Sequence, residues 1–208
     1  MYPCFTHTHK HKPTQCTYAL TKTLYYIFFC LIHSPSILDI KLGTHTDHPD
    51  CGPAKLKTHL RIDAITTTPV LGYRFSGMNV YQSATRALKV YGKTYAISWD
   101  PAKIEEPLTE YLRNGDVIRY DVLPAFIEKL KVVRDFLAKK MHNFYAASLL
   151  FVYDTPDEGS SEGSAPEIRL IDFAHVWDTK EYDVDSGALV GVENLIKAFE
   201  SMAKNITQ

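Results

Sequence analysis

The sequence of 208 residues predicts an α+β fold, in which helices pack beside a sheet. Apolar and polar residues alternate from residue 36 to residue 43, which is the period of a half-buried strand. Residues 123–141 instead carry apolar side chains at the three- and four-residue spacing of an amphipathic helix. The 13 tyrosines and 10 phenylalanines supply aromatic side chains, which strands favour.

The elements follow one another along the chain with clear boundaries. Strands are predicted at 36–43, 70–81, 93–99, 147–154 and 167–174, and helices at 53–63, 123–141 and 189–204. Pro53 suits the first turn of its helix, because a backbone N–H at that position would have no hydrogen-bond partner within the helix. Residues 154–166 are rich in Gly, Ser and Pro, which predicts a mobile connection between two strands.

The helix at 123–141 shows the strongest pattern. Its predicted buried stripe comprises Leu123, Phe126, Ile127, Leu130, Val133, Leu137 and Met141. Lysines and arginines occupy the other faces, and a solvated surface is favoured over a binding patch there.

Residues 1–33 do not resemble the rest of the chain. Alternating His7, His9 and His11 could form a weak metal-binding tail, but a disordered segment is favoured. The apolar run 24–32 is shorter than the roughly 20 residues that span a bilayer. It has the length of a signal-peptide core, yet no small-residue cleavage site follows it, so no membrane span or secretion signal is expected.

Charge and cysteine content narrow the class of protein. The formal net charge of -1 gives no bulk field for binding nucleic acid or a membrane. None of the cysteines lies in a C-x-x-C pair, which favours a reducing compartment over a disulfide framework. A cytoplasmic or nuclear location is therefore expected by default.

Asp39 and Lys41 form the first candidate pair. They are two residues apart on a predicted strand, so their side chains lie on the same face. A lysine can neutralise charge on a phosphoryl group in transfer, and an acid can contact a hydroxyl or orient the lysine. The alternative is a surface ion pair, worth at most about 1 kcal/mol.

Asp172 is the second candidate. It follows the apolar run that ends at Ile171, which places a carboxylate at the mouth of the core. Mg²⁺ prefers oxygen ligands, and kinases hold metal-bound nucleotide with an aspartate followed by an aromatic residue. A plain aspartate at the end of a strand is the alternative.

Three motifs occur in an informative order. P-x-x-x-D-x-K-x-G at 35–43, S-L-L at 148–150 and I-D-F-A-H at 171–175 resemble the motifs of the inositol polyphosphate kinase family. Residues 143–154 look like the corresponding strand of inositol polyphosphate multikinases. The resemblance covers residues 34–208.

The resemblance implies a fold and a role for the last glycines. Residues 34–208 would form the larger, C-terminal lobe of the family's fold, an antiparallel sheet flanked by helices that is distantly protein-kinase-like. Asp185, Gly187 and Gly191 resemble the family's D-x-G-x-x-x-G, whose glycines would let the chain turn tightly into the last helix. Residues 1–33 do not resemble the family's N-terminal ATP-binding lobe and are expected to be disordered or a mis-assigned start of the chain.

The implied activity is phosphorylation of a soluble inositol polyphosphate, dependent on ATP and Mg²⁺. The multikinase type is favoured over hexakisphosphate kinases and trisphosphate 3-kinases. The alternative is a catalytically silent relative that binds inositol phosphates or protein partners. A protein kinase is disfavoured, because the sequence has no H-R-D, D-F-G or Gly-rich loop.

The resemblance also implies roles for particular residues. Asp172 would ligate Mg²⁺ on the ATP phosphates, and Asp39 and Ser148 would contact the nucleotide. Lys41 would meet the acceptor hydroxyl and the transferred phosphoryl group, which makes Asp39, Lys41 and Asp172 the expected catalytic set. His175 would lie near the inositol phosphate.

The predicted helix 53–63 would line the inositol phosphate pocket. Its candidate substrate-binding residues are Lys55, Lys57, His59 and Arg61. Cationic donors suit a highly anionic substrate. Lys55 and His59 are favoured, because residues four apart share one face of a helix.

Overall fold

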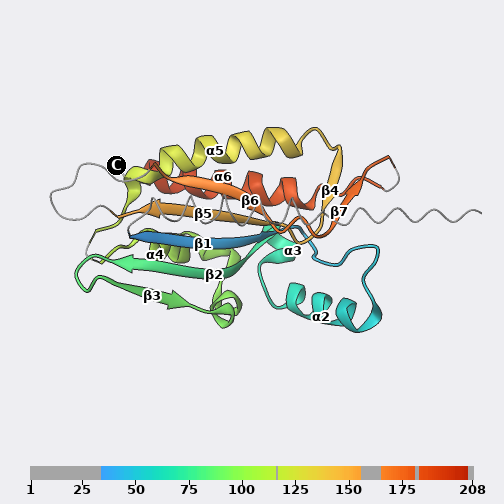
Figure 1. Ribbon diagram of the computed structural model, residues 1–208, viewed down its shortest axis with the longest axis horizontal. Helices are drawn as coiled ribbons and strands as arrows, with labels where there is room; N and C mark the ends of the chain where they lie inside the picture. Colours follow the sequence, from blue (N-terminus) through green and yellow to red (C-terminus); the bar gives the residue numbers. More distant parts are fainter. Residues whose placement is uncertain (1–33, 116, 156–164, 181–182, 206–208) are drawn as a thin grey trace, which may run out of the picture. The chain divides into compact units, whose positions relative to one another are not determined.

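A five-stranded antiparallel sheet forms the centre of the computed structural model (Figure 1). In spatial order the strands are β3 (Ala87–Tyr91), β2 (Tyr73–Gln82), β1 (Pro35–Leu42), β5 (Ser148–Asp154) and β6 (Glu167–Ile171). Helices pack against this sheet, which confirms the α+β prediction.

The structure describes residues 34–115, 117–155, 165–180 and 183–205. The predictions made for residues 1–33, and for most of the connection 154–166, therefore lie outside the described residues. No helix in the described part of the chain is long and apolar enough to cross a membrane.

Strand β1 lies in the middle of the sheet and pairs with β2 on one side and β5 on the other. Its residues alternate strictly between half-buried and buried, as the sequence predicts. Leu38, Ile40 and Leu42 are fully buried in the core, so the intervening Asp39 and Lys41 lie on the opposite face. The pairing with β2 shifts by one residue after Asp39, a bulge that increases the local twist.

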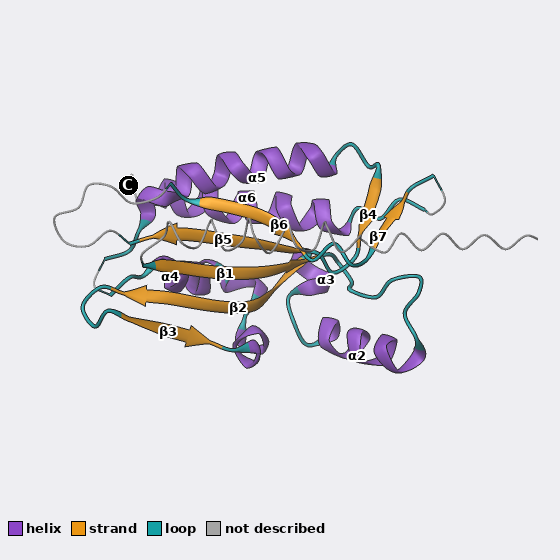
Figure 2. Ribbon diagram, in the orientation of Figure 1, coloured by secondary structure: helices purple, strands orange, loops and turns teal. Residues whose placement is uncertain are grey.

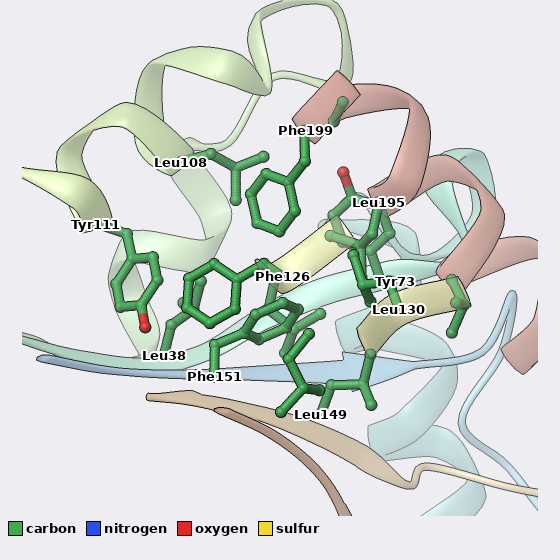
Figure 3. Close-up of a cluster of buried hydrophobic side chains, with 14 of the residues drawn as sticks. Leu38, Tyr73, Leu108, Tyr111, Phe126, Leu130, Leu149, Phe151, Leu195 and Phe199 are labelled. Atoms are coloured by element: carbon green, nitrogen blue, oxygen red, sulfur yellow. The ribbon is translucent and has the colours of Figure 1, made fainter. Parts of the chain in front are cut away.

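Three helices cover the core face of the sheet (Figure 2). They are α4 (Glu105–Leu112), α5 (Leu123–Leu137) and α6 (Gly187–Asn205). Aromatic side chains join the layers: the Phe126 ring lies 5.4 Å from Phe151 of β5, and Phe151 lies 5.7 Å from Phe199 of α6 (Figure 3). These edge-to-face contacts fix the helices on the sheet.

The connection from β1 to β2 holds two helices, α2 (Pro53–Ala64) and α3 (Thr68–Leu71). The helix predicted at 53–63 is thus present. The short strands β4 (His142–Phe144) and β7 (Val176–Asp178) form a separate two-stranded sheet. Three 3₁₀ segments complete the described elements: η1 (Lys93–Ser98), η2 (Pro101–Lys103) and η3 (Tyr120–Val122).

Several predicted elements are wrong in part, among them the strand expected at 70–81, which begins only at Tyr73 because Val70 and Leu71 belong to α3. The strand expected at 93–99 is the 3₁₀ helix η1, and strand β3 precedes it. The long helix ends at Leu137 instead of residue 141, since Lys140 adopts a left-handed φ of 50°. Met141 therefore leaves the buried stripe and is 62% exposed.

Strand β6 ends at Ile171, three residues before the predicted boundary. The reason is Asp172, whose φ of 65° turns the chain out of the sheet. Phe173 consequently lies outside the strand and is 53% exposed.

The last helix begins at Gly187, two residues earlier than predicted, and its glycines have a different role from the one expected. Neither Gly187 nor Gly191 has a positive φ, so they do not form a tight turn. A Cβ atom at Gly191 would lie 2.1 Å from the carbonyl oxygen of Gly72. One at Gly187 would lie 2.7 Å from the Thr44 nitrogen, so both glycines permit close approach of α6 to neighbouring backbone.

Gly191→Ala should therefore lower the free energy of unfolding by at least about 2 kcal/mol, because the clashing atom is backbone and cannot rotate away. Gly92→Ala is the control, since nothing lies within 4 Å of a Cβ there. Urea denaturation of both variants measures the difference, and equal stability would contradict the proposed close contact.

Candidate active site

One end of the sheet brings Lys41 of β1 and Asp172, which follows β6, together. Lys41 Nζ lies 3.2 Å from Asp172 Oδ2 and also donates a hydrogen bond of 2.8 Å to the Ala146 carbonyl oxygen. The Lys41 side chain is 18% exposed and that of Asp172 is 57% exposed. A fixed cation thus lies beside a carboxylate that is open to solvent.

The two residues that contact Lys41 Nζ both have strained backbones. Ala146 has a φ of 53° and Asp172 has a φ of 65°, in the left-handed region that non-glycine residues rarely adopt. Each costs about 1–2 kcal/mol relative to a right-handed conformation. Strain of this kind is concentrated at functional sites, where it fixes the position of reactive groups.

Asp39 and Ser148 place two buried oxygen atoms on the same side of the sheet as Lys41. Asp39 Oδ1 and Ser148 Oγ are near enough to interact electrostatically, but neither atom makes a well-formed hydrogen bond with the described residues. Burial raises the pKa of the Asp39 carboxyl; Asp172 adds to the increase, while the Ser148 hydroxyl and the Lys41 ammonium oppose it. Since buried polar atoms normally have partners, these two oxygens are available to a ligand.

The carboxylates at this end of the sheet fit a metal ion that arrives with other ligands. Within the described ranges, no group of three or more His, Cys, Asp or Glu side chains could hold a metal alone. Mg²⁺ usually takes only one or two protein carboxylates and completes its shell with phosphate and water oxygens. The exposed Asp172 suits that arrangement.

A cluster of imidazoles lies beside the Asp172 loop. Lys55 Nζ on α2 is 3.2 Å from His48 Nε2 and 3.3 Å from His175 Nε2. The two imidazole rings stack with centroids 3.7 Å apart, and Trp177 stacks on His48 at 5.3 Å. Burial lowers the pKa of both imidazoles, and the Lys55 ammonium adds to the decrease.

The predicted substrate residues of α2 divide between two faces of the helix. Lys55 contacts His175, and His59 Nδ1 lies 2.7 Å from Thr46 Oγ1, so both face the cluster. Lys57 and Arg61 are exposed and make no hydrogen bond or ion pair with the described residues. The structure therefore brings Lys55, His59 and His175 together and leaves Lys57 and Arg61 apart from them.

Comparison with known proteins identifies the family. A sequence model of inositol polyphosphate kinase matches residues 28–200, most of the chain. The chain belongs to the inositol polyphosphate kinase family. Its relatives include human inositol hexakisphosphate kinase 3, which is 30% identical over 196 residues, covering 81% of this chain and 48% of the relative. The mouse protein of the same name is 28% identical over 181 residues, covering 78% of this chain and 46% of the relative.

Solved structures show the same fold. Inositol phosphate multikinase Ipk2 from S. cerevisiae, in complex with ADP and Mn²⁺, has a TM-score of 0.72 and 22% identity, covering 82% of this chain and 79% of that chain. This kinase-family chain thus spans most of the multikinase structure, but about half the length of the curated hexakisphosphate kinases that it matches.

Asp63 is a buried residue of this kinase-family chain that sequence reasoning missed. It is 5% exposed and accepts hydrogen bonds from the Thr46 N–H at 2.8 Å and from Arg74 Nη1 at 3.0 Å. The Thr46 hydroxyl also donates to Asp63 at 2.9 Å. Asp63 thus ties α2 to both the β1–α2 loop and β2.

A signal for Asp63 existed in the sequence. It lies four residues after His59 and eight after Lys55, so it falls on the face of α2 that carries them. His48 was also missed, because it lies in a loop, where no periodicity indicates the direction of a side chain.

Asp63→Ala should destabilise the protein by about 3 kcal/mol, because it leaves the Arg74 guanidinium buried without its carboxylate. Asp135→Ala removes a carboxylate that is 68% exposed and paired with Arg134, so it should cost less than about 1 kcal/mol. Chemical denaturation of both variants provides the comparison. Equal losses would show that Asp63 is not a structural anchor.

Asp39→Asn should stabilise the fold at neutral pH, with a smaller gain in mildly acidic buffer. A raised pKa means that the native state binds this proton more tightly than the unfolded state, so the wild type loses stability as pH rises through that range. The asparagine side chain does not ionise, so the variant does not lose stability over this pH range. Glu128→Gln, at a side chain that is 73% exposed, is the control in denaturation curves recorded across pH. A pH-independent difference for Asp39→Asn would refute the raised pKa.

Proposed function

We propose that the protein transfers a phosphoryl group from ATP to a hydroxyl of a soluble inositol polyphosphate. The observation that carries the proposal is the contact of Lys41 Nζ with Asp172 Oδ2, at 3.2 Å, beside the cluster formed by Lys55 and His175. The Lys41–Asp172 pair suits metal-bound nucleotide, and the cluster formed by Lys55 and His175 suits an anionic acceptor. Membership in the inositol polyphosphate kinase family supports the same reaction.

The residues at the end of the sheet would act on the transferred group directly. Asp172 would ligate Mg²⁺ on the ATP phosphates, where the ion neutralises negative charge when bound. Lys41, fixed by Ala146 and Asp172, would neutralise charge on the phosphoryl group as the hydroxyl attacks in line. Asp39 and Ser148 would use their unpartnered oxygens to position the nucleotide and the reacting hydroxyl.

Lys55, His59 and His175 would hold phosphates of the acceptor. A phosphate monoester carries close to two negative charges at neutral pH, and paired cationic donors hold it. Lys57 and Arg61 lie on other faces of α2, so we assign them to the periphery of the acceptor site or to solvent. The acceptor class therefore depends mainly on one face of a single helix.

For the subtype we retain the multikinase proposal, supported by residues 143–154 and by the short segment from residue 44 to residue 72. The named sequence relatives are hexakisphosphate kinases. A panel of acceptors from inositol trisphosphate to inositol hexakisphosphate tests the choice. Turnover restricted to the hexakisphosphate would overturn it.

Asp172→Asn should abolish transfer of labelled phosphate from ATP to the inositol polyphosphate, because the amide is a poor ligand for Mg²⁺. Lys41→Ala should lower kcat by about 10²–10³-fold, which is the usual loss on removing one donor to a developing charge. Asp178→Asn, an exposed carboxylate of β7, is the control and should retain activity.

Mg-ATP binding by calorimetry separates the proposal from its alternative. Normal turnover in either site variant would refute the assigned roles. A wild-type chain that binds inositol phosphates but neither binds Mg-ATP nor transfers phosphate would instead be a silent binding protein.

A further inference from the structure

The hydrogen bonds of Lys55 determine which protons the neighbouring imidazoles carry. Its ammonium lies 3.2 Å from His48 Nε2 and 3.3 Å from His175 Nε2. An ammonium group only donates, so both Nε2 atoms must accept and cannot carry a proton. Both rings are therefore neutral, with their proton on Nδ1.

This arrangement occupies two of the three Lys55 donors without an anion. A phosphate that approaches Lys55 meets two lone pairs at the Nε2 atoms, which repel its oxygens. If the rings gain a proton, the same two atoms become donors to those oxygens. The site thus changes from two neutral imidazoles that accept hydrogen bonds from Lys55 to a positively charged set of donors that binds phosphate.

We infer that His48 couples phosphate binding at Lys55 to the uptake of a proton by the stacked His48–His175 pair. The inference rests on the proposed function, because the phosphate is one group of the inositol polyphosphate acceptor. His48 is 7% exposed, beneath His175 and against Trp177, so it acts as a positioning residue through Lys55 and His175. The pair takes up roughly one proton, because two charged rings stacked at 3.7 Å would repel each other.

The surroundings of the pair keep it neutral until an anion arrives. Lys55 and His59 from α2 lower the pKa of both imidazoles, in addition to burial. Asp50 opposes this for both rings and Asp47 for His48, but neither carboxylate forms an ion pair with these rings in the described part of the chain. A phosphate next to Lys55 adds the negative charge that these loop carboxylates supply only from a distance. His48 Nδ1 has no hydrogen-bond partner among the described residues. Among these residues, therefore, no acceptor beside its N–H stabilises the positive charge that a second proton, on Nε2, would give the ring.

The free protein tests the neutral state without substrate. Imidazole nitrogen chemical shifts of the ¹⁵N-labelled full chain should show His48 and His175 with protonated Nδ1 and unprotonated Nε2 at neutral pH. On addition of inositol hexakisphosphate, the Nε2 shifts should move toward those of a protonated ring. A protonated pair in the free protein, or shifts unchanged by bound ligand, would overturn the inference.

Calorimetry measures the proton directly. Binding of inositol hexakisphosphate to the full chain is titrated in two buffers of different ionisation enthalpy and over a pH series. The wild type should take up more protons than His48→Gln, and its affinity should rise more steeply as pH falls, by up to about tenfold per pH unit for one proton. His142→Gln, an exposed histidine of β4, is the matched control and should behave as the wild type.

The outcomes separate the inference from the proposed function. Binding by the wild type and by His48→Gln with the same proton count and pH slope overturns the inference and leaves the proposed function standing. No binding by the wild type at any pH contradicts both. Weaker binding by His48→Gln with an unchanged pH slope assigns His48 a purely structural role, and this too overturns the inference.

Discussion

The alternation of side chains along β1 is the constraint on which the rest of the structure depends. Because successive residues point to opposite faces, Leu38, Ile40 and Leu42 enter the core only if Asp39 and Lys41 face away from it. The central place of β1 in the sheet puts this charged row beside Ser148 of β5. A slip of one residue in register would bury both charges and expose the core. The register of β1 therefore determines both the packing of the core and the position of the site residues.

Backbone geometry, rather than side-chain chemistry, sets the precision of the site. Ala146 and Asp172 adopt left-handed conformations, and both contact Lys41 Nζ. The contact of Gly191 with Gly72 likewise fixes α6 against the turn that precedes β2. Well-packed elements can hold such strained positions, because the core supplies far more stabilisation than one strained residue costs.

The two halves of the candidate site treat charge differently. At the end of the sheet, Lys41 and Asp172 form an ion pair, while Asp39 keeps a raised pKa through burial. Beside α2, the Lys55 ammonium donates to the neutral imidazoles of two histidines. Asp63, on the same helix, pairs with Arg74. The half suited to nucleotide thus contains fixed charges, whereas the half suited to the acceptor can change its charge with its ligand.

The sequence by itself determined strands β1, β2, β5 and β6, the amphipathic helix and the shared face of Asp39 and Lys41, because periodicity of two or of nearly four residues is a local property. It also identified Lys55 and His59 as one face of α2. Only the tertiary structure decided the end of β6 at Asp172, the close-approach role of Gly187 and Gly191, and the meeting of His48 with His175. Those features depend on contacts between segments far apart in the chain, and no local pattern encodes a distance between a loop and a helix. The stretch predicted as a strand at 93–99 became a 3₁₀ helix for the same reason: its aromatic residues pack around Phe75 instead of joining the sheet.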